Sequence, residues 1–222
     1  MAKRKLQKYA ELASFKNVIQ PGWEELENGF YLKGKWAKGY FNNEHPVILE
    51  LGCGKGEYTV NLAKQFPLKN FIGIDKKGAR LWKGSGQALD TGLQNAVFIR
   101  ANAESLPLLF GKGELSEIWL TFPDPQPKRK QEKKRLTNPS FLKLYKQVLK
   151  KDGIIHLKTD NIPLFDYTLE KIKEEGYHLI DFKRDLYSAP PEWAVSAIKT
   201  HYELRFLDKG SKIAYLKFRL RH

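Results

Sequence analysis

A stiff acidic loop that runs into a basic segment is the part of this chain best suited to chemistry on a polyanion. Residues 123–127 hold three prolines, and Asp124 is the one carboxylate among them. Residues 128–135 then carry six Lys or Arg and one Glu, a net charge of +5. Proline fixes φ and removes a backbone donor, so the loop is expected to be rigid. The pattern predicts that the basic strip holds phosphates while Asp124 faces the group that is altered.

Two less specific interpretations of the same segment stay open. An aspartate beside proline is common in turns, where its carboxylate caps its own loop. A run of lysines and arginines is commonly a solvated face of the protein. If the strip does contact phosphates, binding should weaken steeply with salt, by roughly 0.7–0.9 in log–log slope for each contact.

A glycine-rich turn follows the first expected strand and is a candidate ligand site. Gly52, Gly54 and Gly56 alternate, which lets the backbone approach a ligand where a Cβ would collide. The spacing is not that of the dinucleotide motif, and the Gly-Lys-Ser/Thr of a P-loop is missing. Glu50, just before the turn, would repel a pyrophosphate but suits a cation. This favours S-adenosylmethionine over a nicotinamide dinucleotide, with a solvated Glu50 in an ordinary turn as the alternative.

Two polar residues at later strand ends extend this candidate site. Asp75 closes the second expected strand, where an acid can hydrogen-bond a ribose diol. Asn102 follows the third expected strand and could bond the adenine edge, or equally cap a loop.

Strands and helices alternate after residue 45, which predicts a mainly parallel sheet covered on both faces. Asn138 can cap the start of one of these helices, and Pro139 suits its first turn. Residues 202–206 are expected to form a strand that pairs with residues 213–218. The other expected strands are 47–51, 70–75, 96–101, 118–122, 154–157 and 177–182, and the expected helices are 58–66, 79–91, 139–153 and 164–175.

The first 44 residues are predicted to form a basic N-terminal extension packed on a main domain at 45–222. A base-stacking platform and, for residues 3–17, a weak membrane-surface helix are alternatives. The aromatic residues expected to pack are Trp23, Phe30, Tyr31, Trp36, Tyr40 and Phe41.

Composition limits the class of protein and its partners. A chain of 222 residues with 41% apolar residues can form one α/β domain, and its net charge of +14 favours a polyanionic partner. No apolar run approaches the roughly 20 residues of a membrane span, and the basic N-terminus lacks the apolar stretch of a secretory signal. The single cysteine, Cys53, and five histidines without ligand spacing predict no disulfide and no metal site. A cytoplasmic location fits these features.

Four blocks of this chain together resemble the bacterial tRNA (guanine-N7)-methyltransferases. The match runs from about residue 47 to residue 206, and its most specific block is the proline loop with its basic segment. A further segment, 200–203, is similar to the family's late Thr-x-x-Glu pattern. The four blocks are residues 50–56, 73–75, 122–136 and 158–160.

The resemblance implies a Rossmann-like class I S-adenosylmethionine-dependent methyltransferase fold, with a mainly parallel seven-stranded sheet and helices on both faces. It implies methyl transfer to N7 of a guanosine in tRNA, the variable-loop guanosine at tRNA position 46, giving 7-methylguanosine. The expected partner is tRNA, with no membrane, no metal and no obligate protein partner, and the protein is expected to be a monomer or homodimer.

The resemblance also assigns residues to roles, with Asp124 as the catalytic residue. The implied cofactor contacts are Glu50, Gly52, Gly54, Asp75, Asn102 and Asp124. The implied substrate contacts are Lys128, Asp160, Thr200 and Glu203, and the implied RNA contacts are Lys130, Lys133, Lys134 and Arg135. Two departures from the family pattern are Gln126, in place of the usual aromatic residue, and the pair 201–202, His-Tyr in place of the commoner Lys-Phe.

The chemistry of N7 is consistent with this set of residues. Guanine N7 carries a lone pair and no proton, so its methylation needs no general base, and catalysis should rest on positioning and electrostatics. Asp160 could accept from guanine N1–H and N2–H₂, a paired contact that adenine lacks. An N-cap role for the helix that follows is the alternative for Asp160, and Glu203 is open to the same two interpretations.

Three other functions remain as competitors. A methyltransferase that acts on another RNA atom or on DNA is disfavoured because the Asn/Asp-Pro-Pro-aromatic tetrad of the exocyclic-amine enzymes is replaced by a different arrangement at 122–125. A non-catalytic RNA-binding module on the same fold is disfavoured by the intact acids Glu50, Asp75 and Asp124. A nicotinamide oxidoreductase is disfavoured by Glu50 and by the glycine spacing.

Overall fold

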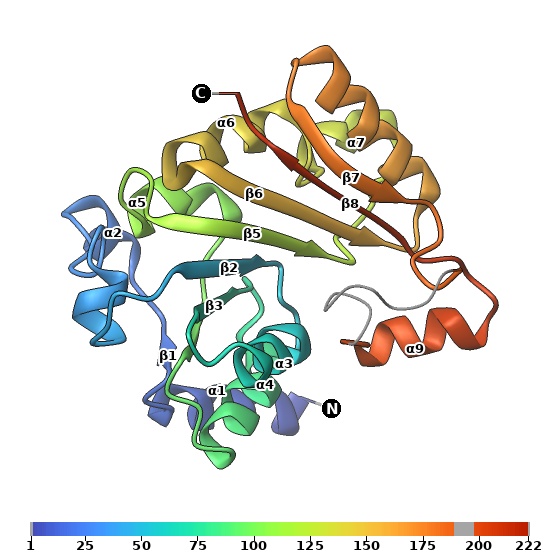
Figure 1. The fold of residues 1–222 in the computed structure, drawn as a ribbon. Helices are drawn as coiled ribbons and strands as arrows, with labels where there is room; N and C mark the ends of the chain where they lie inside the picture. Colours follow the sequence, from blue (N-terminus) through green and yellow to red (C-terminus); the bar gives the residue numbers. More distant parts are fainter. Residues whose placement is uncertain (1, 189–197, 222) are drawn as a thin grey trace.

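A mainly parallel sheet with helices on both faces forms the core of the computed structural model, which describes residues 2–188 and 198–221 (Figure 1). The strand order is β1-β4-β3-β2-β5-β6-β8-β7, and among the described strands β8 alone runs opposite to the others, antiparallel to both β6 and β7. The expected sheet is confirmed, with β1 as a short additional edge strand. The strands are β1 (Val18–Ile19), β2 (Val47–Leu51), β3 (Asn70–Ile74), β4 (Ala96–Ile99), β5 (Leu115–Thr121), β6 (Leu149–Thr159), β7 (His178–Lys183) and β8 (Ala214–Arg219).

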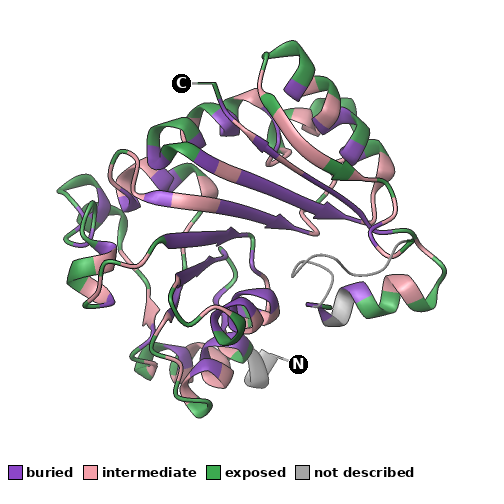
Figure 2. Cartoon of the chain, in the orientation of Figure 1, coloured by how far each residue is buried: buried purple, intermediate pink, exposed green. Residues whose placement is uncertain are grey.

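The helices divide between the two faces of the sheet, and the central strands between them are buried (Figure 2). One face carries α1 (Ala2–Ser14), α3 (Glu57–Gln65) and α4 (Gly78–Asp90), and the other carries α5 (Leu106–Leu109), α6 (Pro139–Val148) and α7 (Ile162–Glu174). The remaining segments are α2 (Trp23–Glu27), α9 (His201–Asp208) and the short turns η1 (Trp36–Tyr40), η2 (Ala103–Ser105) and η3 (Arg129–Lys134).

Strand β2 shows why helices pack on both faces of the sheet. Its five residues are all buried, as expected for a parallel strand between two helical layers. Successive side chains point to opposite faces, so Leu49 joins the core under α6 while Ile48 joins the core under α3. Glu50 alternates with Leu49 and therefore faces the α3 side of the sheet.

The N-terminal extension is built into the fold by long-range contacts. Helix α1 packs on α4, and β1 pairs in parallel with β4 through Val18 and Phe98. The carboxylate of Glu114 accepts hydrogen bonds from the backbone N–H groups of Gly34 and Trp36, at 2.8 Å each. The indole N–H of the fully buried Trp36 donates to the carbonyl of Leu109 at 3.0 Å.

The aromatic residues of the extension divide between the core and the surface. Phe30, Trp36 and Phe41 are buried as predicted, and Tyr40 is half-buried. The prediction is wrong for Trp23 and Tyr31, whose side chains are 63% and 62% exposed.

Two other segments differ from the expected elements. Residues 202–206 belong to helix α9 rather than to a strand, because Thr200 and Glu203 form a capping box at its start. The helix expected to run to residue 153 ends at Val148, and the chain enters β6 at once. Gly153 lies in an irregular part of β6, where an added Cβ would sit 2.4 Å from Leu149 Cγ. Within residues 2–188 and 198–221, no helix is both long and apolar enough to cross a lipid bilayer.

Candidate active site

The strand order brings the predicted site residues to one edge of the sheet. Asn102, Asp75, the glycine turn, Asp124 and Asp160 follow β4, β3, β2, β5 and β6, which are neighbours in that order. These five strands are parallel, so their carboxyl ends share one edge, seen in Figure 1 on the side where α9 lies. Strand β2 is the switch point between β3 and β5, where open α/β sheets form their ligand crevice.

The three glycines of the turn have different surroundings. All three have positive φ, with +77° at Gly52, +56° at Gly54 and +68° at Gly56. A Cβ on Gly56 would lie 2.5 Å from the ring of Phe98 in β4 and 3.2 Å from Gly84 Cα in α4, so this residue is packed against both elements. A Cβ on Gly52 would meet nothing closer than Leu136 Cδ1 at 3.8 Å. Space is therefore free beside Gly52 and Gly54, whereas Gly56 allows the turn to pack tightly against the rest of the protein.

Asp75 is fixed by backbone donors on both of its oxygens. Oδ2 accepts from the N–H of Gly54 at 3.0 Å, and Oδ1 accepts from the N–H of Lys77 at 2.7 Å. The side chain is buried, and each carboxylate oxygen can accept a further hydrogen bond. This arrangement suits a diol at the end of β3.

Glu50 is a buried carboxylate at the floor of the site. It is 3% exposed and accepts hydrogen bonds from the hydroxyl groups of Thr59 and Thr121, and from the N–H of Thr59 at 2.8 Å. Burial raises the pKa of Glu50 to about 7, although these hydrogen bonds oppose the rise. A cation beside the carboxylate would favour its ionised form, so the environment fits a positively charged ligand better than an anionic one.

These observations fit the predicted S-adenosylmethionine. The space beside Gly52 and Gly54 can admit a ligand, and Asp75 presents hydrogen-bond acceptors. A positively charged ligand would offset the cost of burying the ionised Glu50 carboxylate. Asn102 lies one strand further along the edge, is exposed, and makes no side-chain capping bond to η2. Its alternative role as a loop cap is therefore wrong.

The proline loop is strained at both ends. Phe122 and Gln126 have φ of 49° and 47°, a region that residues other than glycine seldom adopt. The N–H of Phe122 donates to the carbonyl of Lys158 at 2.7 Å, which ties the loop to β6. Asp124 is exposed between them, and its Oδ1 accepts from the N–H of Gln126 only at the long distance of 3.4 Å. The loop thus presents this carboxylate to solvent.

Arg135 braces the loop from the far end of the basic segment. Its Nε and Nη2 both lie 3.3 Å from the carbonyl oxygen of Gln126, and its guanidinium lies 4.3 Å from the centre of the Tyr167 ring. The predicted phosphate contact at Arg135 would compete with these bonds. The other cations of the segment, Lys128, Arg129, Lys130, Lys133 and Lys134, are exposed.

Asp160 follows β6 and is half-buried. The N-cap of α7 is its neighbour Asn161, whose side chain accepts from the N–H of Leu164 at 2.9 Å. The capping alternative for Asp160 is therefore wrong. Desolvation raises the pKa of this carboxyl above its usual value, so donors that hydrogen-bond its ionised form would be favoured there.

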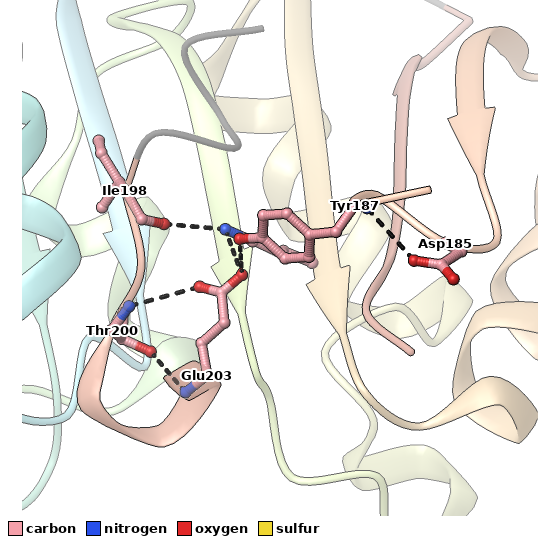
Figure 3. A network of polar contacts seen from close by, with 6 residues as sticks. Asp185, Tyr187, Ile198, Thr200 and Glu203 are labelled. Carbon is pink, nitrogen blue, oxygen red and sulfur yellow. Dashed lines mark hydrogen bonds and ion pairs between the residues drawn. The ribbon is translucent and has the colours of Figure 1, made fainter. Parts of the chain in front are cut away.

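Thr200 and Glu203 lie at the start of α9, and Glu203 is fully buried (Figure 3). The Thr200 hydroxyl accepts from the N–H of Glu203, and the Glu203 carboxylate forms an ion pair with Lys158 at 2.7 Å. From the sequence, Lys158 belongs to the block 158–160 but has no assigned role, and Thr59 and Thr121 are not recognised. The available signal for Lys158 was a cation directly after the apolar run 154–157.

Comparisons with known proteins agree with this geometry. A family model described as "Putative methyltransferase" matches residues 44–216. A Christiangramia forsetii protein named tRNA (guanine-N(7)-)-methyltransferase is 51% identical, with 99% of each chain covered. A protein of the same name from Bacteroides thetaiotaomicron is 46% identical, with 99% of this chain and 87% of the relative covered.

A solved structure shows the same fold. The 16S rRNA methyltransferase KamB superposes with a TM-score of 0.65 at 19% identity, over 83% of this chain and 92% of that chain. The predicted Rossmann-like methyltransferase fold is confirmed.

Proposed function

Because the chain belongs to the tRNA (guanine-N7)-methyltransferase family, we propose that it transfers a methyl group from S-adenosylmethionine to N7 of the variable-loop guanosine at tRNA position 46. The product is 7-methylguanosine. The observation that carries the proposal is the order of groups along one sheet edge: cofactor acids at the ends of β3 and β2, then Asp124, then Asp160.

The chain's own groups would hold the cofactor at the ends of β4, β3 and β2. Asp75 would accept from the ribose hydroxyls, Asn102 would meet the adenine edge, and Glu50 would balance positive charge from beneath. Gly52 and Gly54 keep the space beside the turn free of Cβ atoms. When bound, S-adenosylmethionine supplies an electrophilic methyl group on a sulfonium.

Asp124 would act on the purine rather than as a base. N7 has no proton to remove, so an exposed carboxylate contributes by orienting the ring and by stabilising the positive charge that develops on it. The loop that presents Asp124 is held at Phe122 by β6 and at Gln126 by Arg135, which limits how far the carboxylate can move. Such restraint is what positioning catalysis requires.

Asp160 would select guanine. It lies one strand beyond the proline loop, and its half-buried carboxylate can accept from N1–H and N2–H₂ together. Adenine offers no such pair of donors on that edge. Leaving this partly desolvated acceptor without its donors also penalises the wrong base.

The exposed lysines of the basic segment would hold the tRNA backbone. Lys128, Lys130, Lys133 and Lys134 are exposed and follow directly on the loop that carries Asp124. Contacts of this kind position the RNA and carry no base selectivity. We place the protein in the cytoplasm, where unmodified tRNA is available.

One nucleoside assay tests the function. The protein is incubated with unmodified tRNA and S-adenosylmethionine labelled in its methyl group, and the tRNA is digested and chromatographed. We expect the label in 7-methylguanosine, and no label in a matched transcript with adenosine at position 46. Label in another nucleoside, or no label, would contradict the proposal, and label retained in the matched transcript would refute the position.

A further inference from the structure

A second group of basic side chains borders the candidate cofactor site, on the side away from the proline loop. Residues 76–83, which follow β3 directly, carry four Lys or Arg and no acid. Lys76, Lys77 and Arg80 are exposed. Within the part of the chain that the structure describes, none of these three side chains forms an ion pair or a hydrogen bond. Their charges are therefore available to a partner outside the chain.

Arg100 joins this group from the neighbouring strand. It follows β4, which is parallel to β3, so both segments leave the sheet at the same edge. An added Cβ on Gly78, the first residue of α4, would lie 3.2 Å from Arg100 Cδ. The guanidinium lies 5.1 Å from the ring centre of Tyr9 in α1, and the side chain remains exposed. We call Lys76, Lys77, Arg80 and Arg100 the second basic cluster.

The acids beside the second basic cluster are held by other groups. Asp75 is buried and accepts from backbone N–H groups on both oxygens. Glu57 forms an ion pair with Lys83 at 2.8 Å. Glu11 of α1 accepts from the indole N–H of Trp82 at 2.6 Å. These three carboxylates are not paired with the cluster, so its positive charge faces solvent.

The sheet places the second basic cluster opposite the basic segment at 128–135. Strand β2, which leads into the glycine turn, lies between β3 and β5. The cluster follows β3 and β4, while the basic segment follows β5. Neighbouring strands lie about 4.8 Å apart, so the ends of β4 and β5 are about 14 Å apart. That span exceeds a single phosphate and suits a polynucleotide backbone that crosses the site.

The other edge of the sheet has a different charge pattern. Helix α2 lies there, near the amino ends of the central strands (Figure 1), and holds three glutamates in five residues. The exposed Lys150 and Lys151 at the start of β6 are followed by the exposed Asp152. Positive charge that is not interrupted by acids is thus a feature of residues 76–83 rather than of every lysine-containing surface of this basic protein.

We propose that the second basic cluster is a second contact surface for the tRNA backbone, so that tRNA lies across the glycine turn and is held on both sides of its target base. This rests on the proposed function, which makes tRNA the partner. It adds to the RNA contacts that the family resemblance implies, which all lie within residues 130–135. Contacts with phosphates at two separated places would fix the direction of the backbone over Asp124 without selecting the base.

The experiment removes two charges of the cluster in the full chain, by Lys76→Ala with Arg80→Ala. Lys77 is left in place because its backbone N–H holds Asp75. Filter binding of unmodified tRNA is measured over a range of salt concentrations. We expect about tenfold weaker binding at moderate salt and a log–log salt slope that is smaller by about 1.4–1.8. Titration calorimetry should give an affinity for S-adenosylmethionine within about twofold of the parent, and the melting temperature should change by less than about 2 °C.

A lysine pair at the other edge is the matched control. Lys150→Ala with Lys151→Ala removes the same charge from side chains that are equally adjacent and exposed. The salt slope and the affinity for tRNA should stay close to those of the parent, within about twofold in Kd. An equal loss in both variants would show that binding follows net charge alone, and an unchanged slope in the Lys76→Ala, Arg80→Ala variant would also overturn the proposal.

Crosslinking tests the position directly. The single cysteine, Cys53, is buried, so Lys76→Cys and Lys150→Cys each supply one exposed thiol for a photoreactive label. We expect the label to crosslink to tRNA from position 76 and not from position 150, and the reverse result, or no crosslink from either, would contradict the proposal. Neither binding nor crosslinking requires methyl transfer. A parent that forms no 7-methylguanosine would therefore refute the proposed function, while a normal product with an unchanged salt slope would refute the second contact surface.

Discussion

The candidate site has two halves, which are held in place by different kinds of contact. The cofactor half lies at the ends of β3 and β2, and the substrate half lies at the ends of β5 and β6. At the ends of β3 and β2, backbone N–H groups within the turns fix Asp75, and Thr59 fixes Glu50 from the helix that follows at once. At the ends of β5 and β6, side chains far apart in sequence carry the structure, as in Lys158 with Glu203. A second example is the hydrogen bond that the Arg135 guanidinium donates to the carbonyl of Gln126.

The difference indicates how each half can fail. The cofactor half is preorganised by its backbone, so steric changes to that backbone should damage it most. The substrate half depends on a few charged side chains, so changes of charge should damage it most. The predictions below test this division, beginning with the largest expected effect.

Replacing Asp124 should separate catalysis from binding. Asp124→Ala is expected to lower kcat by about 10²–10³-fold, because it removes the carboxylate that stabilises charge on the purine. The Kd for tRNA should change by less than about threefold, since the side chain is one exposed group among many contacts. Single-turnover methyl transfer at saturating tRNA measures the first quantity and filter binding measures the second. Equal losses in both would contradict the assigned role.

A pair of glycines on α4 should show how tightly the cofactor half is packed. A Cβ on Gly84 would lie 2.5 Å from the carbonyl oxygen of Lys55 and 2.8 Å from Gly56 Cα, both backbone atoms of the turn. Gly84→Ala is expected to cost about 1–3 kcal/mol, lowering Tm by about 5 °C and weakening S-adenosylmethionine binding by about tenfold or more.

Gly86→Ala on the same helix is the control for that prediction. Its Cβ would meet the Phe15 ring at 3.6 Å, an ordinary contact, and alanine favours the helix by about 1 kcal/mol. Calorimetric titration and thermal melting measure both variants. A loss of equal size in both would show that the contact between turn and helix is not what holds the site.

Neutralising two lysines should act on tRNA affinity alone. Lys133→Ala with Lys134→Ala is expected to weaken tRNA binding by about tenfold at moderate salt and to reduce the log–log salt slope by about 1.4–1.8. The value of kcat at saturating tRNA should stay within about twofold. Arg135 is left in place because its guanidinium holds Gln126. An unchanged salt slope would mean that the two lysines only face solvent.

The smallest expected effect is the pH dependence of cofactor binding. With a pKa of about 7, Glu50 is mostly protonated at pH 6.5 and mostly ionised at pH 8. Affinity for S-adenosylmethionine should therefore be about fourfold weaker at pH 6.5, with proton release on binding. Titration calorimetry in two buffers of different ionisation enthalpy measures both quantities, and Glu50→Gln should remove the dependence. An equally steep profile in that variant would assign it to another group.

The same pKa has a consequence for folding, with the opposite trend. Because the folded-state pKa of Glu50 lies above the usual 4.5, the folded protein keeps a proton that the unfolded chain loses between those values. The contribution of Glu50 to stability is therefore full below about pH 4.5 and is lost as the pH rises through about 7. Thermal melts of the parent and of Glu50→Gln across this range should converge at the acidic end.

The sequence predicted the cofactor half better than the substrate half, for a physical reason. The bounds of β2 matched, and Glu50 and Asp75 took up the expected places, because an apolar run and a glycine turn act over a few residues. Lys158 could not be recognised, since its partner Glu203 lies 45 positions away and only the closed fold brings them together.

Helix α9 was missed for a different reason. Residues 202–206 alternate like a strand, but the Thr-x-x-Glu pattern at 200–203 is also the signature of a capping box. That signal was available and was interpreted only as a substrate contact. In the N-terminal extension, Trp23 and Tyr31 resemble Phe30 in type, and only the fold decides which of them is covered.

The way the first 44 residues are attached has a consequence for synthesis on the ribosome. They are made first, yet β1 has no neighbour until the strand at Ala96–Ile99 has emerged, and Gly34 and Trp36 have no carboxylate until Glu114 follows. More than half of the polypeptide must therefore leave the exit tunnel before its beginning can dock. The first-made residues therefore cannot reach their final place before about half of the chain has been synthesised.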